Sequence, residues 1–187
     1  GDFSWGYNGA HPFAIESGYG TPDEFRALVD AAHGLGIAVV VDVVYNHWGP
    51  QDLSLCRFDL PGLGENNGGI YFYTDWRRES GWGPRPDFGR QEVRTYIADN
   101  VMMWLDEYNV EGLRFDSTVN IRKESGTDVP DGWSLLQQIN DRVDARYPGR
   151  IMIAEDLQGD AWLTKATSGG GAGFDAQWDG GFFHPIH

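Results

Sequence analysis

The segment "NVEGLRFDSTVNI", residues 109–121, has the composition of a buried β-strand whose end carries two charges. Its valine, leucine and phenylalanine residues suit a pleated, packed segment. Side chains alternate between the two faces of a strand, so Arg114 and Asp116 point to the same side. A fold that contains this strand therefore brings a guanidinium group and a carboxylate into one interior.

The sequence on both sides of this strand predicts alternating helices and strands. A helix begins at Thr21, where Pro22 and Glu24 complete a capping box, and it ends at a pair of glycines. An almost continuous apolar run follows at 37–44, which is typical of a parallel strand covered on both faces. Further helices are predicted at 91–108 and 131–147, further strands at 150–155 and 174–179, and a flexible loop at 168–173. This alternation predicts an α/β fold with a parallel sheet.

Polar side chains cluster where successive strands end. The residues concerned are Asp42, Tyr45, Asn46 and His47, then Arg114 and Asp116, then Glu155 and Asp156. The carboxyl ends of parallel strands form the edge of the sheet where active sites are assembled. Three polar strand ends in succession therefore predict a catalytic or binding site.

Composition argues against several classes of binding partner. The chain has 187 residues, a net charge of −14 and a pI near 4.5, which argues against binding to nucleic acid or to anionic membranes. It has no apolar run long enough to span a membrane and no visible signal peptide. Cys56 is the single cysteine, which excludes an internal disulfide and favours a reducing compartment, so we expect a cytoplasmic protein and a structural thiol.

Aromatic residues make up 14% of the chain, and many lie in glycine-rich segments that are expected to form loops. Some of these aromatic residues are expected to line a cleft, and a flat, neutral ligand such as a sugar ring would suit it. Residues 48–90 lack a sustained period and are predicted to be an inserted, functional excursion. The loop aromatics are Trp5, Tyr7, Trp48, Tyr71, Tyr73, Trp76 and Trp82.

Each charged candidate also has a structural interpretation. Asp42 could simply pair with Arg114, and His47 could be a turn histidine bonded to backbone. Asp116 could be an N-cap or an ion-pair partner, and Glu155 a solvated strand-end charge. In the catalytic alternative, the two carboxylates have different roles. Asp116, beside a guanidinium, would keep a low pKa and act as a nucleophile, whereas an apolar setting would raise the pKa of Glu155 and suit a general acid.

Three motifs resemble sequence signatures of the α-amylase superfamily, in the family's order: "DVVYNH" (42–47), "GLRFD" (112–116) and "AED" (154–156). The stretch "WGYNGAHPFAIESGYGTPDEFRALVDAAH" also looks like the family's segment before the third barrel strand. The resemblance implies a (β/α)₈ barrel and a retaining mechanism on α-1,4-glucans, with no cofactor. It also implies that 48–90 is the small domain inserted after the third strand.

By the same resemblance, Asp116 would be the nucleophile, Glu155 the general acid/base, and Arg114 the residue that holds Asp116. His47 would bind the sugar in the cleavage subsite and Tyr7 would stack beneath it. Asp42 would support Arg114, and Asn120 would contact substrate where many relatives carry a histidine. With asparagine there, the family's usual calcium site is not expected.

The chain is similar to glycogen branching enzymes and to maltooligosyltrehalose trehalohydrolases, for example in "GFDAQWDGGFFHPIH" (173–187). We expect a branching glucanotransferase; hydrolysis of α-glucans and a catalytically silent glucan-binding homologue are the alternatives. The family's fourth signature, with a third catalytic carboxylate, is absent. We therefore interpret residues 1–187 as an incomplete barrel, about strands three to six, with open sheet edges and little activity without the remainder of the barrel.

Overall fold

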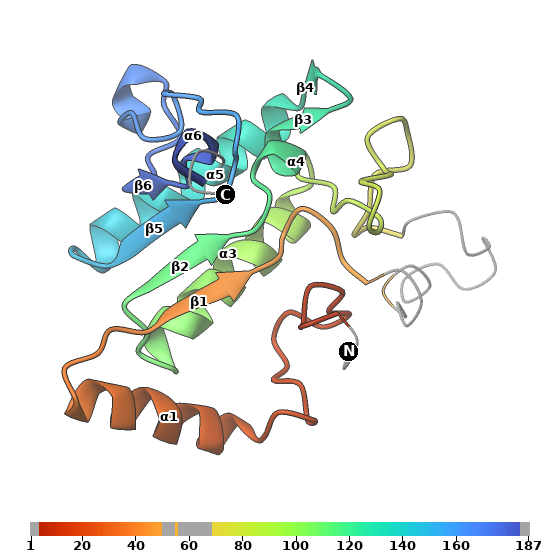
Figure 1. Cartoon of the computed structure of the whole chain (residues 1–187). Coiled ribbons are helices and arrows are strands. Elements are labelled where there is room, and N and C mark those ends of the chain that lie inside the picture. The colour runs from red at the N-terminus through yellow and green to blue at the C-terminus, as the bar shows by residue number, and fades with distance from the viewer. Residues whose placement is uncertain (1–3, 50–54, 56–68, 184–187) are drawn as a thin grey trace.

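The fold is built on a four-stranded parallel sheet with the order β1-β2-β5-β6 (Figure 1). In the computed structural model, residues 4–49, 55 and 69–183 are described. The strands are β1 (Val40–Val43), β2 (Gly112–Phe115), β5 (Ile151–Ala154) and β6 (Ala176–Gln177). Each lies within a segment predicted from the sequence to be a strand, and every pairing is parallel, as an α/β fold requires.

Three long helices connect or precede these strands. They are α1 (Pro22–Gly34), α3 (Gln91–Asp106) and α5 (Pro130–Arg146). Figure 1 shows α3 and α5 side by side on one face of the sheet, behind β1, β2 and β5. None of the helices within the described residues is long and apolar enough to cross a membrane.

The start of α1 confirms the capping box. The Thr21 hydroxyl accepts a hydrogen bond from the backbone N–H of Glu24 at 3.2 Å, and the Glu24 carboxylate accepts one from the backbone N–H of Thr21 at 2.7 Å. Two N–H groups that the helix itself cannot satisfy are therefore bonded.

The core lies between the sheet and its helices. All four residues of β2 are buried, and the buried face of α3 includes Val93, Ile97, Val101 and Leu105. The strand β1 differs from the prediction that both of its faces are covered, because Val40 is 41% exposed. The reason is its position at an edge of the sheet, where β2 is its one partner among the described strands.

Several short elements were not predicted. A helical turn, α4 (Val119–Arg122), leads into a hairpin of β3 (Lys123–Glu124) and β4 (Thr127–Asp128). The hairpin turns at Ser125 and Gly126, both of which have positive φ angles, and a Ser-Gly pair is a turn signal that could have revealed it. The predicted loop 168–173 overlaps a 3₁₀ turn, η1 (Thr167–Gly169), and α6 spans Gly180–Phe183.

The predicted excursion 48–90 is described only at its two ends and at residue 55. Residues 69–90 are irregular, with isolated bridges that pair Phe72 with Pro86 and Glu79 with Pro84. Arg85, which is fully buried, donates to the backbone carbonyl of Asn120 at 2.8 Å and forms an ion pair with Glu124. This part of the excursion therefore packs against the segment that follows β2. Residues 50–54 and 56–68, including Cys56, lie outside the described residues.

Candidate active site

The register of the sheet brings the predicted residues together. Asp42 on β1 lies opposite Arg114 on β2, and Arg114 lies opposite Ile153 on β5. Residues two positions further along a strand share its face, so Asp116 and Glu155 follow on the same side. One guanidinium and three carboxylates thus meet at the carboxyl-terminal edge of the sheet.

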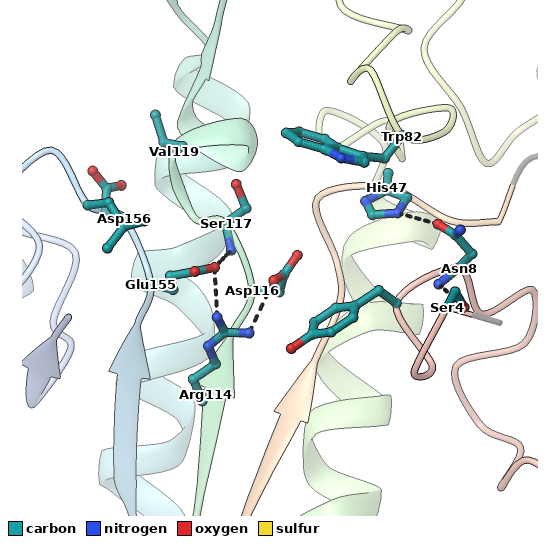
Figure 2. A pocket seen from close by; sticks show the side chains of 12 residues that line it. Ser4, Asn8, His47, Trp82, Arg114, Asp116, Ser117, Val119, Glu155 and Asp156 are labelled. Atoms are coloured by element: carbon teal, nitrogen blue, oxygen red, sulfur yellow. Dashed lines mark hydrogen bonds and ion pairs between the residues drawn. The ribbon is translucent and has the colours of Figure 1, made fainter. Parts of the chain in front are cut away.

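Arg114 is the hub of this cluster. Its Nη1 donates to both Asp42 oxygens at 2.7 Å and to Asp116 Oδ1 at 3.1 Å, while its Nη2 lies 2.8 Å from Glu155 Oε2. Figure 2 shows Asp116 and Glu155 on either side of this guanidinium. Planar donors in a fixed fork can hold several carboxylates at defined positions, which an ammonium group could not do as well.

An aromatic ring covers the same guanidinium. The Trp178 ring, directly after β6, has its centroid 4.2 Å from Arg114 Cζ. Within the described residues, the buried Nε of Arg114 has no hydrogen-bond partner. A stacked indole stabilises a cation electrostatically and restricts its rotation. Sequence reasoning missed this contact, because nothing in the motif around Arg114 points to a residue 64 positions away.

Asp116 is oriented by a second donor. The Asn46 side-chain amide donates to Asp116 Oδ2 at 2.8 Å and to the Asp116 backbone carbonyl at 2.8 Å. With Arg114 on Oδ1 and Asn46 on Oδ2, both carboxylate oxygens are held by side chains. Asn46 is fully buried. The sequence showed it at a strand end but did not reveal this role.

Glu155 has its pKa raised above the ordinary value of 4.5, mainly because burial disfavours its charged form. The backbone N–H of Ser117, which donates to Oε2 at 2.9 Å, and the charge of Arg114 oppose that shift. The charge of Asp116 and a hydrogen bond with it raise the pKa further. The direction predicted from the sequence is therefore confirmed, and burial is its first cause.

The cluster lies at the base of a cavity of about 640 Å³. Strand ends supply the charged part of its wall, while Tyr7 and Trp82 come from loops. Figure 2 shows Trp82 beside His47. Of the loop aromatics singled out in the sequence, these two line the cavity, whereas Trp48 and Tyr73 are buried in the core. The cavity is lined by Ser4, Tyr7, Asn8, His47, Trp82, Arg114, Asp116, Ser117, Val119, Glu155, Asp156 and Leu157.

His47 faces the cavity as a neutral ring. Burial lowers its pKa to about 4, so the imidazole carries no charge near neutral pH. Its Nδ1 lies beside Asn46 Oδ1, and its Nε2 lies 3.2 Å from Asn8 Oδ1. A neutral imidazole has a single N–H, so His47 donates to one of these two amide oxygens and keeps its other nitrogen as an acceptor.

Tyr7 and Asp42 are joined to the hub. The Tyr7 hydroxyl donates to Asp42 Oδ2 at 2.8 Å, and this hydrogen bond is the first cause that raises the Tyr7 pKa. Asp42 thus links Tyr7 to Arg114 from outside the cavity lining. The structural interpretation of Asp42, an ion pair with Arg114, is confirmed.

Asn120 lies beside Ser117. Its side-chain amide donates to Ser117 Oγ at 2.7 Å, and it lies outside the cavity lining. Ser117 has a φ of 42° and directs its backbone N–H at Glu155. Asn120 therefore touches the loop that supports Glu155. No group of three or more His, Cys, Asp or Glu side chains within the described residues could hold a metal ion.

The chain is similar to several known proteins. The family model for the catalytic domain of alpha amylase matches residues 2–54. The 1,4-alpha-glucan branching enzymes GlgB of Corynebacterium glutamicum and Kitasatospora aureofaciens are 37% and 36% identical to the chain over 97% of its length. The chain spans about a quarter of the length of these curated relatives, 26% and 25% respectively.

A solved structure from Salmonella typhimurium that is named as an alpha amylase superposes with a TM-score of 0.68 at 34% identity. The match covers 84% of this chain and 24% of that one. The chain is therefore similar to 1,4-alpha-glucan branching enzymes along 97% of its length, and its residues 2–54 match the alpha-amylase catalytic domain.

Proposed function

We propose that the protein acts on α-1,4-glucans by a retaining double displacement and transfers the cleaved chain to make a branch. The observation that carries this proposal is the position of Arg114, whose two terminal nitrogens hold Asp116 and Glu155 at the base of one cavity. Retaining glycoside chemistry needs two carboxyl groups close together, one ionised and one protonated. Because the Arg114 guanidinium binds both carboxyl groups, Asp116 and Glu155 lie close together.

In the first step, Glu155 donates its proton to the glycosidic oxygen while an Asp116 oxygen attacks the anomeric carbon. The bond from that carbon to the leaving oxygen breaks, and a covalent glycosyl ester on Asp116 forms. Glu155 Oε2 already accepts from Ser117 and Arg114, so Oε1 is the oxygen that carries the proton. The raised pKa of Glu155 favours this protonated state.

In the second step, Glu155 is a carboxylate and takes a proton from an attacking hydroxyl group. That oxygen bonds to the anomeric carbon and displaces Asp116, which restores both residues. A sugar hydroxyl as the attacking group gives a branch, and water gives hydrolysis. The second outcome is the alternative function, because the same residues serve both.

The remaining predicted residues are proposed to bind the sugar. His47, whose neutral ring donates from one nitrogen only, would accept a hydrogen bond from a sugar hydroxyl at the other nitrogen. Tyr7 would pack against the ring and is anchored to Asp42. Asn120 would act on substrate through Ser117. We also propose that the four-stranded sheet is an arc of a (β/α)₈ barrel and that 48–90 is its inserted domain.

The test is the product pattern on amylose. Purified protein carrying this chain is incubated with amylose, and new α-1,6 linkages and new reducing ends are counted separately. A branching enzyme gives linkages without a matching rise in reducing ends, whereas a hydrolase gives reducing ends alone. A silent glucan-binding homologue gives neither.

Asp116→Asn is expected to lower turnover by about four orders of magnitude or more, because the covalent intermediate cannot form. Circular dichroism should show an intact fold. Asp30→Asn, an exposed aspartate on α1, is the matched control and should keep full activity. Turnover retained by Asp116→Asn would show that another residue is the nucleophile.

A further inference from the structure

A second cavity, of about 460 Å³, lies outside the catalytic cavity. It is formed where the segment after β2 meets the first turn of α5 and the loop that follows β5. Its lining includes Arg122, Lys123, Asp128, Trp133, Asp160 and Trp162. The mechanism proposed above uses none of these side chains.

Two indole rings line this cavity, and hydrogen bonds fix the ring of Trp133 and the backbone of Trp162. The Trp162 backbone N–H donates to Asp160 Oδ1 at 3.0 Å, and its carbonyl accepts from Ala172 N at 2.9 Å. Trp133 donates from Nε1 to the Gly170 carbonyl at 3.2 Å. Trp162 is nevertheless 47% exposed. A rigid, half-exposed indole offers a large contact surface with little conformational entropy left to lose on binding.

The charges around these rings cancel. Arg122 pairs with Asp160 at 3.2 Å, and Lys123 pairs with Asp128 at 3.5 Å. Lys165 also lies 3.8 Å from the Trp162 ring centroid and Arg122 is shared with Asp156, so three cations and three anions leave no net charge to select an ionic ligand. They do leave both donors and acceptors at the edge of an aromatic surface. A neutral molecule with apolar ring faces and many hydroxyl groups fits this combination, and a glucan segment has that chemistry.

One ion pair separates the two cavities. Arg122 binds Asp156 through Nε at 2.9 Å and through Nη2 at 2.7 Å, and both side chains are almost completely buried. Arg122 lines the second cavity, whereas Asp156 lines the catalytic cavity. A single polymer could therefore contact both cavities across this pair.

We propose that the Trp133–Trp162 cavity binds a segment of the α-glucan chain remote from the bond that is cleaved. The proposal rests on the glucan substrate assigned in the proposed function. Its consequence is a preference for longer chains, because short oligosaccharides cannot reach both cavities. Trp162 is the main contact, because its side chain is half exposed. Lys165 Nζ lies 3.8 Å from the ring centroid, so the sugar would contact the part of the ring that this ammonium group leaves open.

The first experiment measures maltoheptaose binding by calorimetry in an Asp116→Asn background, where no turnover consumes the ligand. Trp162→Ala should weaken the Kd about tenfold, the loss of one aromatic contact of about 1.4 kcal/mol. Trp76→Ala is the matched control, because Trp76 is 55% exposed on a different loop. Its Kd should equal that of the parent. Equal Kd values for Trp162→Ala and Trp76→Ala would overturn the proposal, as would an absence of binding.

The second experiment needs no variant of the cavity and so does not depend on the folding of Trp162→Ala. The protein is oxidised with N-bromosuccinimide, and modified tryptophans are located by peptide mass spectrometry. Maltoheptaose should protect Trp162 and leave Trp76 unprotected. If Trp162 is protected but amylose is not processed, the result supports the binding site and contradicts the proposed function. If amylose is processed and Trp162 is unprotected, the function stands and this site falls.

Discussion

At the scale of single residues, the Glu155 carboxyl group has its proton affinity set by several neighbours. Burial raises its pKa, Asp116 raises it further, and Ser117 and Arg114 lower it, with a net increase above 4.5. Since the proposed first step needs the protonated form, kcat/KM should fall as the pH rises through this pKa. The fall should therefore begin above pH 4.5, and a profile whose alkaline limb lies below that value would contradict the assignment.

Asp116→Asn should lower the Glu155 pKa, because it removes the negative charge that opposes ionisation. A ¹³C NMR titration of the glutamate carboxyl groups in the parent and the variant measures the change directly, without turnover. Asp30→Asn should leave the Glu155 titration unchanged. A Glu155 pKa that stays constant or rises in Asp116→Asn would mean that the two carboxyl groups do not interact.

At the scale of elements, the close pairing of β2 and β5 depends on a residue without a side chain. A Cβ on Gly112 would lie 2.2 Å from the backbone oxygen of Ile151 and 2.4 Å from its Cγ2. Gly112→Ala should therefore push the strands apart and lower the free energy of unfolding by about 2–3 kcal/mol. The strand shift would also displace Arg114, two residues away, so activity should fall with stability.

Urea denaturation followed by circular dichroism measures this change. Gly34→Ala is the control, because a Cβ on Gly34 meets nothing within 4 Å and the residue ends a helix. It should be neutral or slightly stabilising. A Gly112→Ala variant as stable as Gly34→Ala would show that the strand pair tolerates the extra methyl group.

At the scale of the whole molecule, a buried ion pair joins the segment after β2 to the loop after β5. Arg122 and Asp156 have side chains that are 4% and 0% exposed. Among the residues that the structure describes, Arg122→Met would leave the buried Asp156 carboxylate with Thr118 as its one side-chain donor, at 3.1 Å. The free energy of unfolding should fall by about 3–5 kcal/mol.

Adding Asp156→Leu to Arg122→Met should recover part of that loss, because the unpaired charge is gone. Guanidinium chloride unfolding of the two single variants and the double variant gives the coupling energy. A double variant whose loss equals the sum of the two single losses would show that the pair does not act as a unit.

The sequence predicted the main elements and the charged cluster because each has a local sequence signature. The capping box at Thr21, the apolar runs and the polar strand ends are all readable within a few residues. Other features depend on residues far apart in the chain. The Trp178 ring over Arg114 and the hydrogen bond from Asn46 to Asp116 have no such local signature.

The sequence by itself determined the resemblance to the alpha-amylase superfamily, the order of the main strands and helices, and the grouping of Arg114, Asp116 and Glu155. Periodicity and spacing along the chain are sufficient for this, since residues at one strand's end meet residues at the next strand's end. Only the tertiary structure decided that Asn120 contacts Ser117 outside the cavity lining and that Trp162 lies half exposed beside a second cavity. Burial and side-chain contact arise from packing between distant segments, which no local pattern of residues specifies.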